Sequence, residues 1–312
     1  MLTPTLAAIS CALGATLAGC GGHVVTRTTR IEGAAQPVAR EATREDLVER
    51  YNLVARGVQT LNLTVELKPT AGSQYSGVIQ EYHEVKAFLL LARPANIRVI
   101  GQVPVIGKTA FDMASDGETF RVSIPSKNKF LVGSVAVTHT SDKPIENLRP
   151  EHILEAFLWP EIRKEEEVLF EEFNDESGRY YILTVLRGGY RTEILRKIWF
   201  DRSDLEVSRL ENFGPKGWLE SDIRLRDWRA FDPSGIGPAP AGAALTTFAR
   251  AITIDRPHDD YRLELEVNKI TLNDPIPAAR FALEQPPGSE LVHVGDGQTP
   301  QQNPLPGKDQ KP

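Results

Sequence analysis

The sequence predicts a mainly β, α+β protein built on one curved antiparallel sheet, an incomplete β-barrel with an N-terminal helix and a short mid-chain helix. Three observations predict this class. From Leu61 onward, apolar residues recur at every second position over many short segments, the period of strands with one buried face. Turn residues separate these segments at short intervals, which favours antiparallel neighbours. Helical periodicity is confined to two places, so we expect the sheet to enclose an apolar cavity.

The N-terminal helix is predicted to begin after Thr43. Thr43 and Asp46 have the spacing of a capping box, with Asp46 in the acidic role. The apolar residues that follow recur at helical spacing: Leu47, Tyr51, Val54 and Val58. The helix therefore has one apolar face, which we expect to pack on the sheet.

Strands follow this helix. Alternation of apolar and polar residues from Leu61 to Leu67 predicts the first strand, and Val78 to Leu91 is expected to form one long strand. Asp116-Gly117 is a hairpin signal between two further strands. Near Asn268-Lys269 the apolar positions change from odd to even numbers, which predicts a β-bulge. About ten to twelve strands are expected in all.

A short helix interrupts the strands in mid-chain. Pro150 to Leu158 has a helical pattern, with Pro150 in its first turn and Pro160 just past its end. Strands resume at Val168. Two short helices are too few to cover the apolar face of so many strands, so the sheet must curl or leave an apolar concavity.

Composition divides the chain into four parts. Residues 1–19 contain an apolar run, Leu6 to Leu17, shorter than the roughly 20 residues that a membrane-spanning helix needs. Residues 20–42 are small and polar and are expected to form a flexible tether. Residues 43–285 are expected to form the half-barrel domain. Residues 286–312 are rich in Pro, Gly and Gln and are expected to form a disordered tail.

The first part ends in Leu17-Ala18-Gly19-Cys20 and resembles a bacterial lipoprotein signal peptide with its lipobox. The resemblance implies that Cys20 becomes the first residue of the mature chain and carries acyl chains that anchor it to a membrane. The next residue is Gly21 rather than Asp, which in lipoprotein sorting favours the outer membrane. The alternative is an ordinary cleaved signal that happens to contain a cysteine.

Charge and cysteine content exclude several classes of protein. The net charge is −6 and no basic cluster occurs, which argues against a nucleic-acid ligand. Cys11 and Cys20 are the only two cysteines. If cleavage precedes Cys20, no disulfide and no cysteine metal site remains for the mature chain.

Sequence signatures of catalysis are missing. The sequence contains no nucleophile elbow, P-loop or dinucleotide-binding glycine motif. None of its six histidines pairs with another at metal-ligand spacing. The densest titratable cluster, His258-Asp259-Asp260, falls between two predicted strands and is expected to be a solvated hairpin turn. We therefore expect neither an enzyme nor a cofactor or metal.

Several stretches carry a family resemblance through their order along the chain: Arg93–Val99, Ser115–Phe120, Ile124–Phe130 and Ile276–Phe281. With the helix and strands around them, they resemble the outer-membrane lipoprotein sorting and carrier proteins of the LolA and LolB type. This resemblance implies an incomplete β-barrel closed by helices, with an apolar cavity that accepts acyl chains of lipids or lipoproteins. It also implies that no cofactor is needed.

The candidate ligand-binding residues are those predicted on the apolar strand faces, with ordinary core packing as the alternative for each: Phe88, Leu90, Ile97, Val99, Phe111, Met113, Phe120, Val122, Leu183, Trp199, Ile223 and Leu225. The expected function is a periplasm-facing outer-membrane lipoprotein that binds acyl chains in lipid or lipoprotein trafficking. Its expected partners are the membrane, through Cys20, and a periplasmic carrier or envelope-assembly protein. The alternative is an interaction lipoprotein of the same fold with a packed interior. The first hypothesis predicts an aliphatic cavity of several hundred Å³; the second predicts none.

Overall fold

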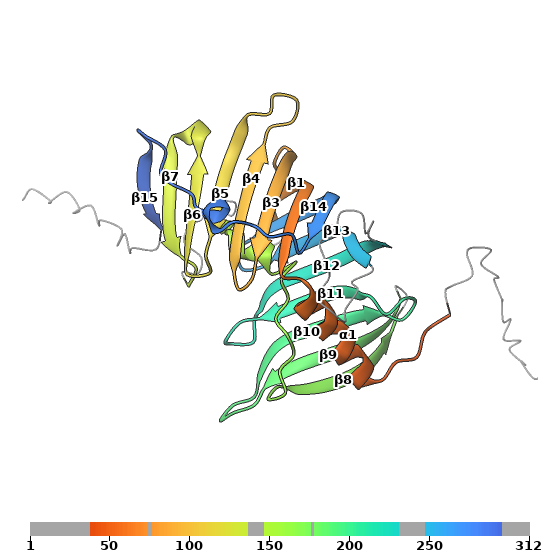
Figure 1. Ribbon diagram of the computed structural model, residues 1–312. Helices are drawn as coiled ribbons and strands as arrows, with labels where there is room; N and C mark the ends of the chain where they lie inside the picture. The colour runs from red at the N-terminus through yellow and green to blue at the C-terminus, as the bar shows by residue number, and fades with distance from the viewer. Residues whose placement is uncertain (1–37, 74–76, 137–146, 176–177, 231–246, 295–312) are drawn as a thin grey trace, which may run out of the picture. The chain divides into compact units, whose positions relative to one another are not determined.

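A computed structural model describes residues 38–73, 77–136, 147–175, 178–230 and 247–294. Within these ranges fifteen strands form one sheet in the order β15-β7-β6-β5-β4-β3-β1-β14-β13-β12-β11-β10-β9-β8, and β2 pairs only with β1. All neighbours are antiparallel except β15 and β7, which are parallel. The end strands β15 and β8 do not pair with each other. The predicted class is confirmed: a mostly β protein with a curved, unclosed sheet (Figure 1).

The strands are β1 Thr60–Ser73, β2 Val78–Glu81, β3 Val85–Ala92, β4 Asn96–Gln102, β5 Thr109–Ser115, β6 Thr119–Ile124, β7 Lys129–Ser134, β8 Glu167–Asn174, β9 Arg179–Arg187, β10 Glu193–Asp201, β11 Val207–Phe213, β12 Leu219–Ala230, β13 Thr247–Arg256, β14 Tyr261–Leu272 and β15 Glu290–Val294. The helices are α1 Arg44–Gly57, α2 Pro150–Leu154 and the short 3₁₀ turns η1 Pro125–Lys127 and η4 Ala278–Phe281.

Helix α1 begins as the sequence predicts. The hydroxyl of Thr43 accepts from the amide of Asp46 at 3.2 Å, and the Asp46 carboxylate accepts from the Thr43 amide at 2.9 Å. This reciprocal box satisfies backbone donors that the helix leaves unpaired. Leu47 and Tyr51 are fully buried and Val58 nearly so, so the predicted apolar stripe is the face that packs on the sheet.

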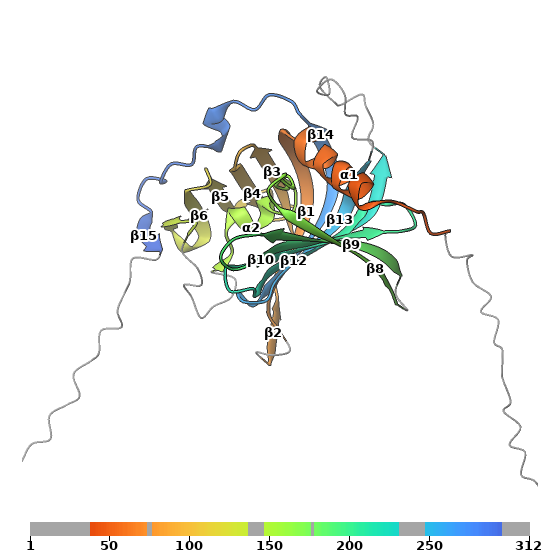
Figure 2. The ribbon, with the colours of Figure 1, turned by 90° about the horizontal axis from the view of Figure 1, so that it is seen from below.

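Helix α2 begins at Pro150 but ends four residues earlier than predicted. The amides of Ala156 and Phe157 donate to carbonyls only three residues back, at 3.2 and 3.0 Å, so the regular helix stops at Leu154. The chain then continues irregularly to Ile162. We call residues 150–162 the inner segment. It lies between the two halves of the sheet (Figure 2), in contact with β4 and β5 and hydrogen-bonded to β12 and β14.

The register confirms the predicted bulge and corrects one predicted strand. Thr64 pairs with Lys269 and Val65 with Val267, so Asn268 is the extra residue. Val78 to Leu91 is two strands, β2 and β3, rather than one. Both pair with β1, on either side of Pro69, which has no N–H to continue the ladder.

A strap of residues 273–289 leads from β14 to β15 and crosses the face of β3–β6 that points away from the inner segment (Figure 1). Arg98 on β4 donates to the carbonyls of Arg280 and Ala282 at 3.1 and 3.0 Å. The strap delivers Glu290–Val294 to β7 as a strand. The sheet therefore extends into the segment that composition predicts to be disordered, because pairing with β7 supplies backbone hydrogen bonds that composition does not reveal.

Candidate functional site: the apolar interior and the polar pocket beside it

The core faces of both halves of the sheet form one apolar interior around the inner segment. Nine of the candidate residues belong to this interior or pack against it: Ile97, Val99, Phe111, Met113, Phe120, Val122, Leu183, Ile223 and Leu225. They come from β4, β5 and β6 in one half and from β9 and β12 in the other. The alternation of each strand therefore brings these residues together.

Three candidate residues lie on the opposite face, and their assignment to the interior is wrong. On β3, Ala87, Leu89 and Leu91 face the core, so Phe88 and Leu90 point the other way. The run from Phe88 to Leu91 is apolar on both faces, and a period of two cannot choose between them. On β10, Ile198 and Phe200 face the core. Trp199 faces away, and its indole N–H donates to Glu211 at 2.7 Å.

The inner segment fills the interior. Ile153 is fully buried, and Phe157 and Trp159 are only 4% exposed. The apolar cavity that Phe157 and Trp159 border, together with Val54 on α1 and Phe248 on β13, has a volume of about 20 Å³. The side chains of the inner segment thus fill the place where the sequence predicts an apolar cavity of several hundred Å³.

Polar contacts from α1 and its neighbours fix the inner segment in place. The Asn52 side chain accepts from the Ile162 amide at 2.8 Å and donates to the Ile162 carbonyl at 3.1 Å. The Arg93 guanidinium donates to the carbonyl of Trp159 at 2.8 Å. The rings of Tyr51 and Trp159 stack at 5.4 Å, and burial raises the pKa of Tyr51 to about 12. The inner segment is therefore held by these bonds at its C-terminal end and by those of His152 and Glu155 at α2.

A polar pocket of about 470 Å³ lies beside α2. Its lining combines charged, aromatic and amide side chains: Val135, Asn147, Arg149, Glu151, His152, Glu155, Trp218, Glu220, Arg256, His258 and Asp259. The Nδ1 atom of His152 is hydrogen-bonded to the Tyr261 hydroxyl. Burial holds the pKa of His152 well below its ordinary value, so this imidazole is neutral at physiological pH.

Two carboxyl groups of this pocket share one face of the inner segment, Glu151 and Glu155. Burial raises the pKa of both groups. Glu155 accepts from Ser221 at 3.0 Å and lies 3.5 Å from Arg256. The sequence carries a signal for this pair, because residues four apart on a helix lie on one face. That the face would be buried could be known only from the packing.

The turn His258-Asp259-Asp260 joins β13 and β14 as predicted, and His258 is exposed, but Asp259 is buried rather than solvated. Asp259 is 8% exposed, and its carboxylate accepts from Arg256 at 3.0 Å. His258 lines the polar pocket and contacts the Trp218 ring at 5.3 Å between centroids. The ion pair between Arg256 and Asp259, which are three residues apart, draws the Asp259 side chain inward.

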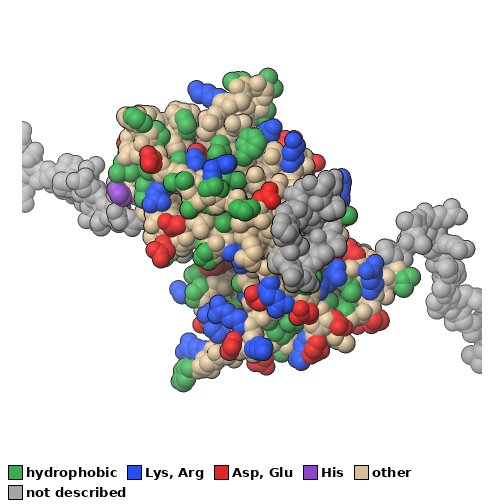
Figure 3. All heavy atoms as spheres, viewed as in Figure 1, with side chains coloured by type: hydrophobic (Ala, Val, Ile, Leu, Met, Phe, Trp, Pro, Cys, Tyr) green, Lys and Arg blue, Asp and Glu red, His purple; other side chains and the backbone are tan. Residues whose placement is uncertain are grey.

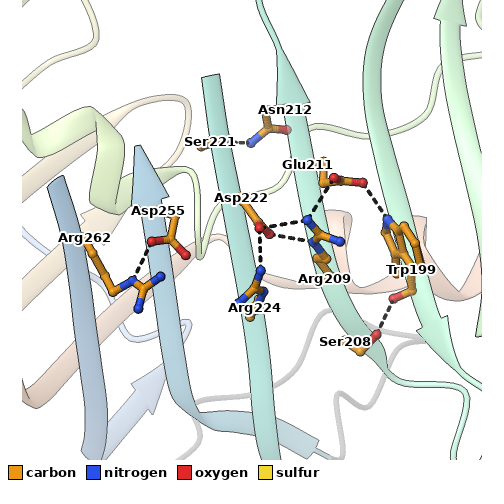
Figure 4. A network of polar contacts seen from close by, with 10 residues as sticks. All are labelled: Trp199, Ser208, Arg209, Glu211, Asn212, Ser221, Asp222, Arg224, Asp255 and Arg262. Atoms are coloured by element: carbon orange, nitrogen blue, oxygen red, sulfur yellow. Dashed lines mark hydrogen bonds and ion pairs between the residues drawn. The ribbon is translucent and has the colours of Figure 1, made fainter. Parts of the chain in front are cut away.

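The outer face of β9–β12 carries a second, open pocket of about 730 Å³, with Trp199, Tyr180 and Phe173 among its lining residues. Figure 4 shows the polar network beside it. Arg209 donates to both carboxylate oxygens of Asp222 at 2.7 and 2.8 Å, and its guanidinium lies 5.2 Å from the Trp199 ring. The charges of this network neutralise one another, so it stabilises the face without marking a ligand site.

Charged side chains of both signs gather over α1 and the adjoining half of the sheet, whereas hydrophobic side chains are spread over the half crossed by the strap (Figure 3). Exposed ion pairs on α1 include Arg56–Glu49 at 2.8 Å. In the part of the chain that the structure describes, no helix has the length and apolarity to cross a membrane. No metal-binding group of three or more His, Cys, Asp or Glu occurs among the same residues. The predicted lipidation site, Cys20, lies outside them.

Comparison with known proteins gives structural neighbours only. No protein-family model matches the sequence, and no curated protein matches it. A LolA superfamily protein from Nitrosomonas europaea aligns over 78% of this chain and 99% of its own, at 12% identity and a TM-score of 0.45. A DUF1329 family protein from Desulfovibrio piger aligns over 76% and 95%, at 14% identity and 0.47.

A third neighbour is a candidate outer membrane lipoprotein-sorting protein domain from Vibrio parahaemolyticus. It aligns over 75% of this chain and 94% of its own, at 10% identity and a TM-score of 0.43. All three alignments span most of both chains, at low sequence identity and at TM-scores below 0.5.

Proposed function

We propose that this protein is a lipid-anchored component of the bacterial envelope that binds acyl chains of lipids or lipoproteins in its apolar interior. In this proposal Cys20 anchors it to the outer membrane, facing the periplasm, and a periplasmic carrier or envelope-assembly protein is its partner. One observation carries the proposal. The apolar concave face between the two halves of the sheet is occupied by the inner segment, whose only regular element is the five-residue helix α2.

Entry of an acyl chain requires the inner segment to move, because the apolar cavity beside it measures only about 20 Å³. Burying an acyl chain is favourable by about 0.8 kcal/mol per methylene, so a chain of about sixteen carbons gains on the order of 10 kcal/mol. The bonds that Asn52 and Arg93 make to the inner segment contribute about 0.5 to 3 kcal/mol each. Displacement also exposes Ile153, Phe157 and Trp159, whose burial contributes about 1.5 to 3 kcal/mol each. The gain from the acyl chain and the cost of uncovering the segment are therefore of similar size, so the exchange is readily reversible.

Apolar burial is non-directional, so chains of different length and unsaturation would fit the same surface. The residues that would contact the chain are the nine interior candidates, together with those of α1 that the inner segment uncovers. No group in this account breaks or forms a covalent bond, so the proposed activity is binding and transfer rather than catalysis.

The test is native mass spectrometry of a form that starts at Gly21, purified from bacterial cells under mild conditions, with lipid extraction in parallel. Co-purified phospholipid or acyl species supports the proposal. Protein that is free of lipid and also fails to take up a fluorescent fatty acid contradicts it.

A second candidate function is favoured by the filled interior itself. A lipoprotein of this fold with a permanently packed core would act through its surface. The end strand β8 offers such a surface, since Leu169 is 47% exposed and Phe170 and Phe173 are each 40% exposed. Strands at a sheet edge present unpaired backbone groups to a partner strand. Lipid-free protein in the test above would favour this function.

A further inference from the structure

We infer that the polar pocket beside α2 binds the head group of the lipid and selects a head group that carries a primary ammonium, which Glu151 would accept. This inference rests on the proposed function, because it assumes that an acyl chain occupies the adjoining interior. It adds a specificity that the apolar interior cannot supply, since apolar burial does not distinguish one head group from another.

Glu151 is the residue that indicates a ligand. Both of its carboxylate oxygens are buried, and neither makes a hydrogen bond of normal geometry with the described residues, although the Ser115 hydroxyl lies near. Burial raises the pKa of this carboxyl, and the nearby Ser115 hydroxyl opposes the shift only in part. A buried acceptor without a donor is costly. An ammonium group, which has three N–H donors and a positive charge, would satisfy both oxygens.

The charges around Glu151 also favour a cation. Four carboxyl groups line the pocket, on Glu151, Glu155, Glu220 and Asp259, against two guanidinium groups, on Arg149 and Arg256. His152 adds no charge, because burial lowers its pKa. Asp259 and Glu155 already neutralise Arg256. A zwitterionic head group would therefore place its ammonium, rather than its phosphate, at Glu151.

The pocket is in the right place for the head group of an amphiphile. Glu151 and Glu155 on the inner segment line the polar pocket. Ala156 and Phe157, which follow directly, line the apolar cavity. The change from polar to apolar lining thus occurs within one turn of chain. A lipid with its ammonium at Glu151 would direct its acyl chains into the space that residues 156–162 vacate, while α2 and its two carboxyl groups stay in place.

The test compares three lipids with identical oleoyl chains: phosphatidylethanolamine, its N-trimethylated analogue phosphatidylcholine, and phosphatidylglycerol. Each is offered in competition to the form starting at Gly21, and bound species are counted by native mass spectrometry. We expect a preference of about tenfold for phosphatidylethanolamine, since a hydrogen bond to a charged group contributes about that factor. Trimethylation removes the N–H donors but keeps the positive charge.

The variant Glu151→Gln is expected to lose this preference while it keeps total lipid uptake. Its matched control, Glu284→Gln, changes an exposed carboxylate of the strap and should keep the preference. Glu151→Gln removes a charge that burial disfavours, so we expect it to fold. The three-lipid comparison in the unmodified chain tests the inference without any variant.

Three outcomes overturn the inference in distinguishable ways. Equal binding of the three lipids refutes head-group selection and leaves the proposed function standing. Failure to bind any of them refutes the proposed function itself. Displacement of bound phosphatidylethanolamine by an equal concentration of phosphoethanolamine, which has no acyl chains, would show that the pocket takes a free amine rather than a lipid head group.

Discussion

Replacement of Asn52 by Ala is the sharpest perturbation of the inner segment. Asn52 lies on the buried side of α1 at 7% exposure. Its side-chain oxygen accepts from the Ile162 amide at 2.8 Å, and its side-chain nitrogen donates to the Ile162 carbonyl at 3.1 Å. The variant removes both bonds and leaves the two backbone groups of Ile162 without these partners.

The cost follows from these two groups. A buried backbone donor or acceptor left unpaired costs about 1 to 3 kcal/mol. Water that enters at the loosened end would satisfy part of this, so we expect the free energy of unfolding to fall by about 2 to 4 kcal/mol. If the segment must move for an acyl chain to enter, the same change lowers the cost of that movement. A reduction of about 2 kcal/mol raises the apparent affinity for a fatty acid up to about thirtyfold.

Three measurements test this prediction. Urea unfolding should show a lower midpoint with an unchanged slope, hydrogen exchange at the Ile162 amide should accelerate, and fluorescent fatty-acid uptake should increase. The control is Glu49→Ala on the exposed side of α1, which breaks a surface pair with Arg56 and should change stability by less than about 0.5 kcal/mol. A destabilisation below about 0.5 kcal/mol for Asn52→Ala would refute the role given to the two hydrogen bonds between Asn52 and Ile162. Unchanged uptake despite lost stability would refute the link to binding.

Three further predictions concern the sheet and the polar pocket. Gly101→Val should destabilise the protein by about 1 to 3 kcal/mol, because a Cβ there would lie 2.4 Å from the Phe111 ring; Gly188→Ala, in open space, is the control for urea unfolding. In the folded state His152 stays neutral, whereas in the unfolded chain its imidazole binds a proton below about pH 6.5. Acidification through that pH therefore favours the unfolded chain. The free energy of unfolding should fall by at most about 1.4 kcal/mol per pH unit. His152→Gln should show a shallower pH slope, and an unchanged slope would contradict this. Asp222→Ala should lower the free energy of unfolding by about 3 kcal/mol, since it leaves Arg209 and Arg224 without their shared carboxylate. Its control, Asp227→Ala, breaks an exposed pair and should cost under about 1 kcal/mol. Equal losses of stability in thermal unfolding would contradict the role given to burial.

Local patterns in the sequence predicted those features of the fold that depend on local chemistry. The capping box at Thr43 located the start of α1, and the change of apolar parity near Asn268 located the bulge, because each pattern is a direct consequence of backbone geometry. The hairpin at Asp116-Gly117 was equally accessible, since Gly117 has the positive φ of 91° that such a turn requires.

Features that depend on distant contacts were not accessible in this way. The apolar run at Phe88 to Leu91 has no preferred face until β1 and β4 pair with β3. Strand β15 exists only because it pairs with β7, which is about 160 residues away in the sequence. Periodicity also could not show that the inner segment fills the interior. Phe157 and Trp159 are apolar, and apolar residues at these positions are equally compatible with covering a cavity and with filling it.

Entry of an acyl chain into the interior should be visible in the fluorescence of Trp159. Trp159 is 4% exposed among the interior side chains, whereas Trp199 lies on the opposite face. A variant in which Trp159 is the only tryptophan, with the other three replaced by Phe, would be titrated with brominated and unbrominated stearic acid. We expect only the brominated chain to quench Trp159 fluorescence, and we expect no quenching in a variant that retains only Trp199. Absence of quenching at Trp159, or equal quenching at Trp199, would contradict the entry of an acyl chain into the interior.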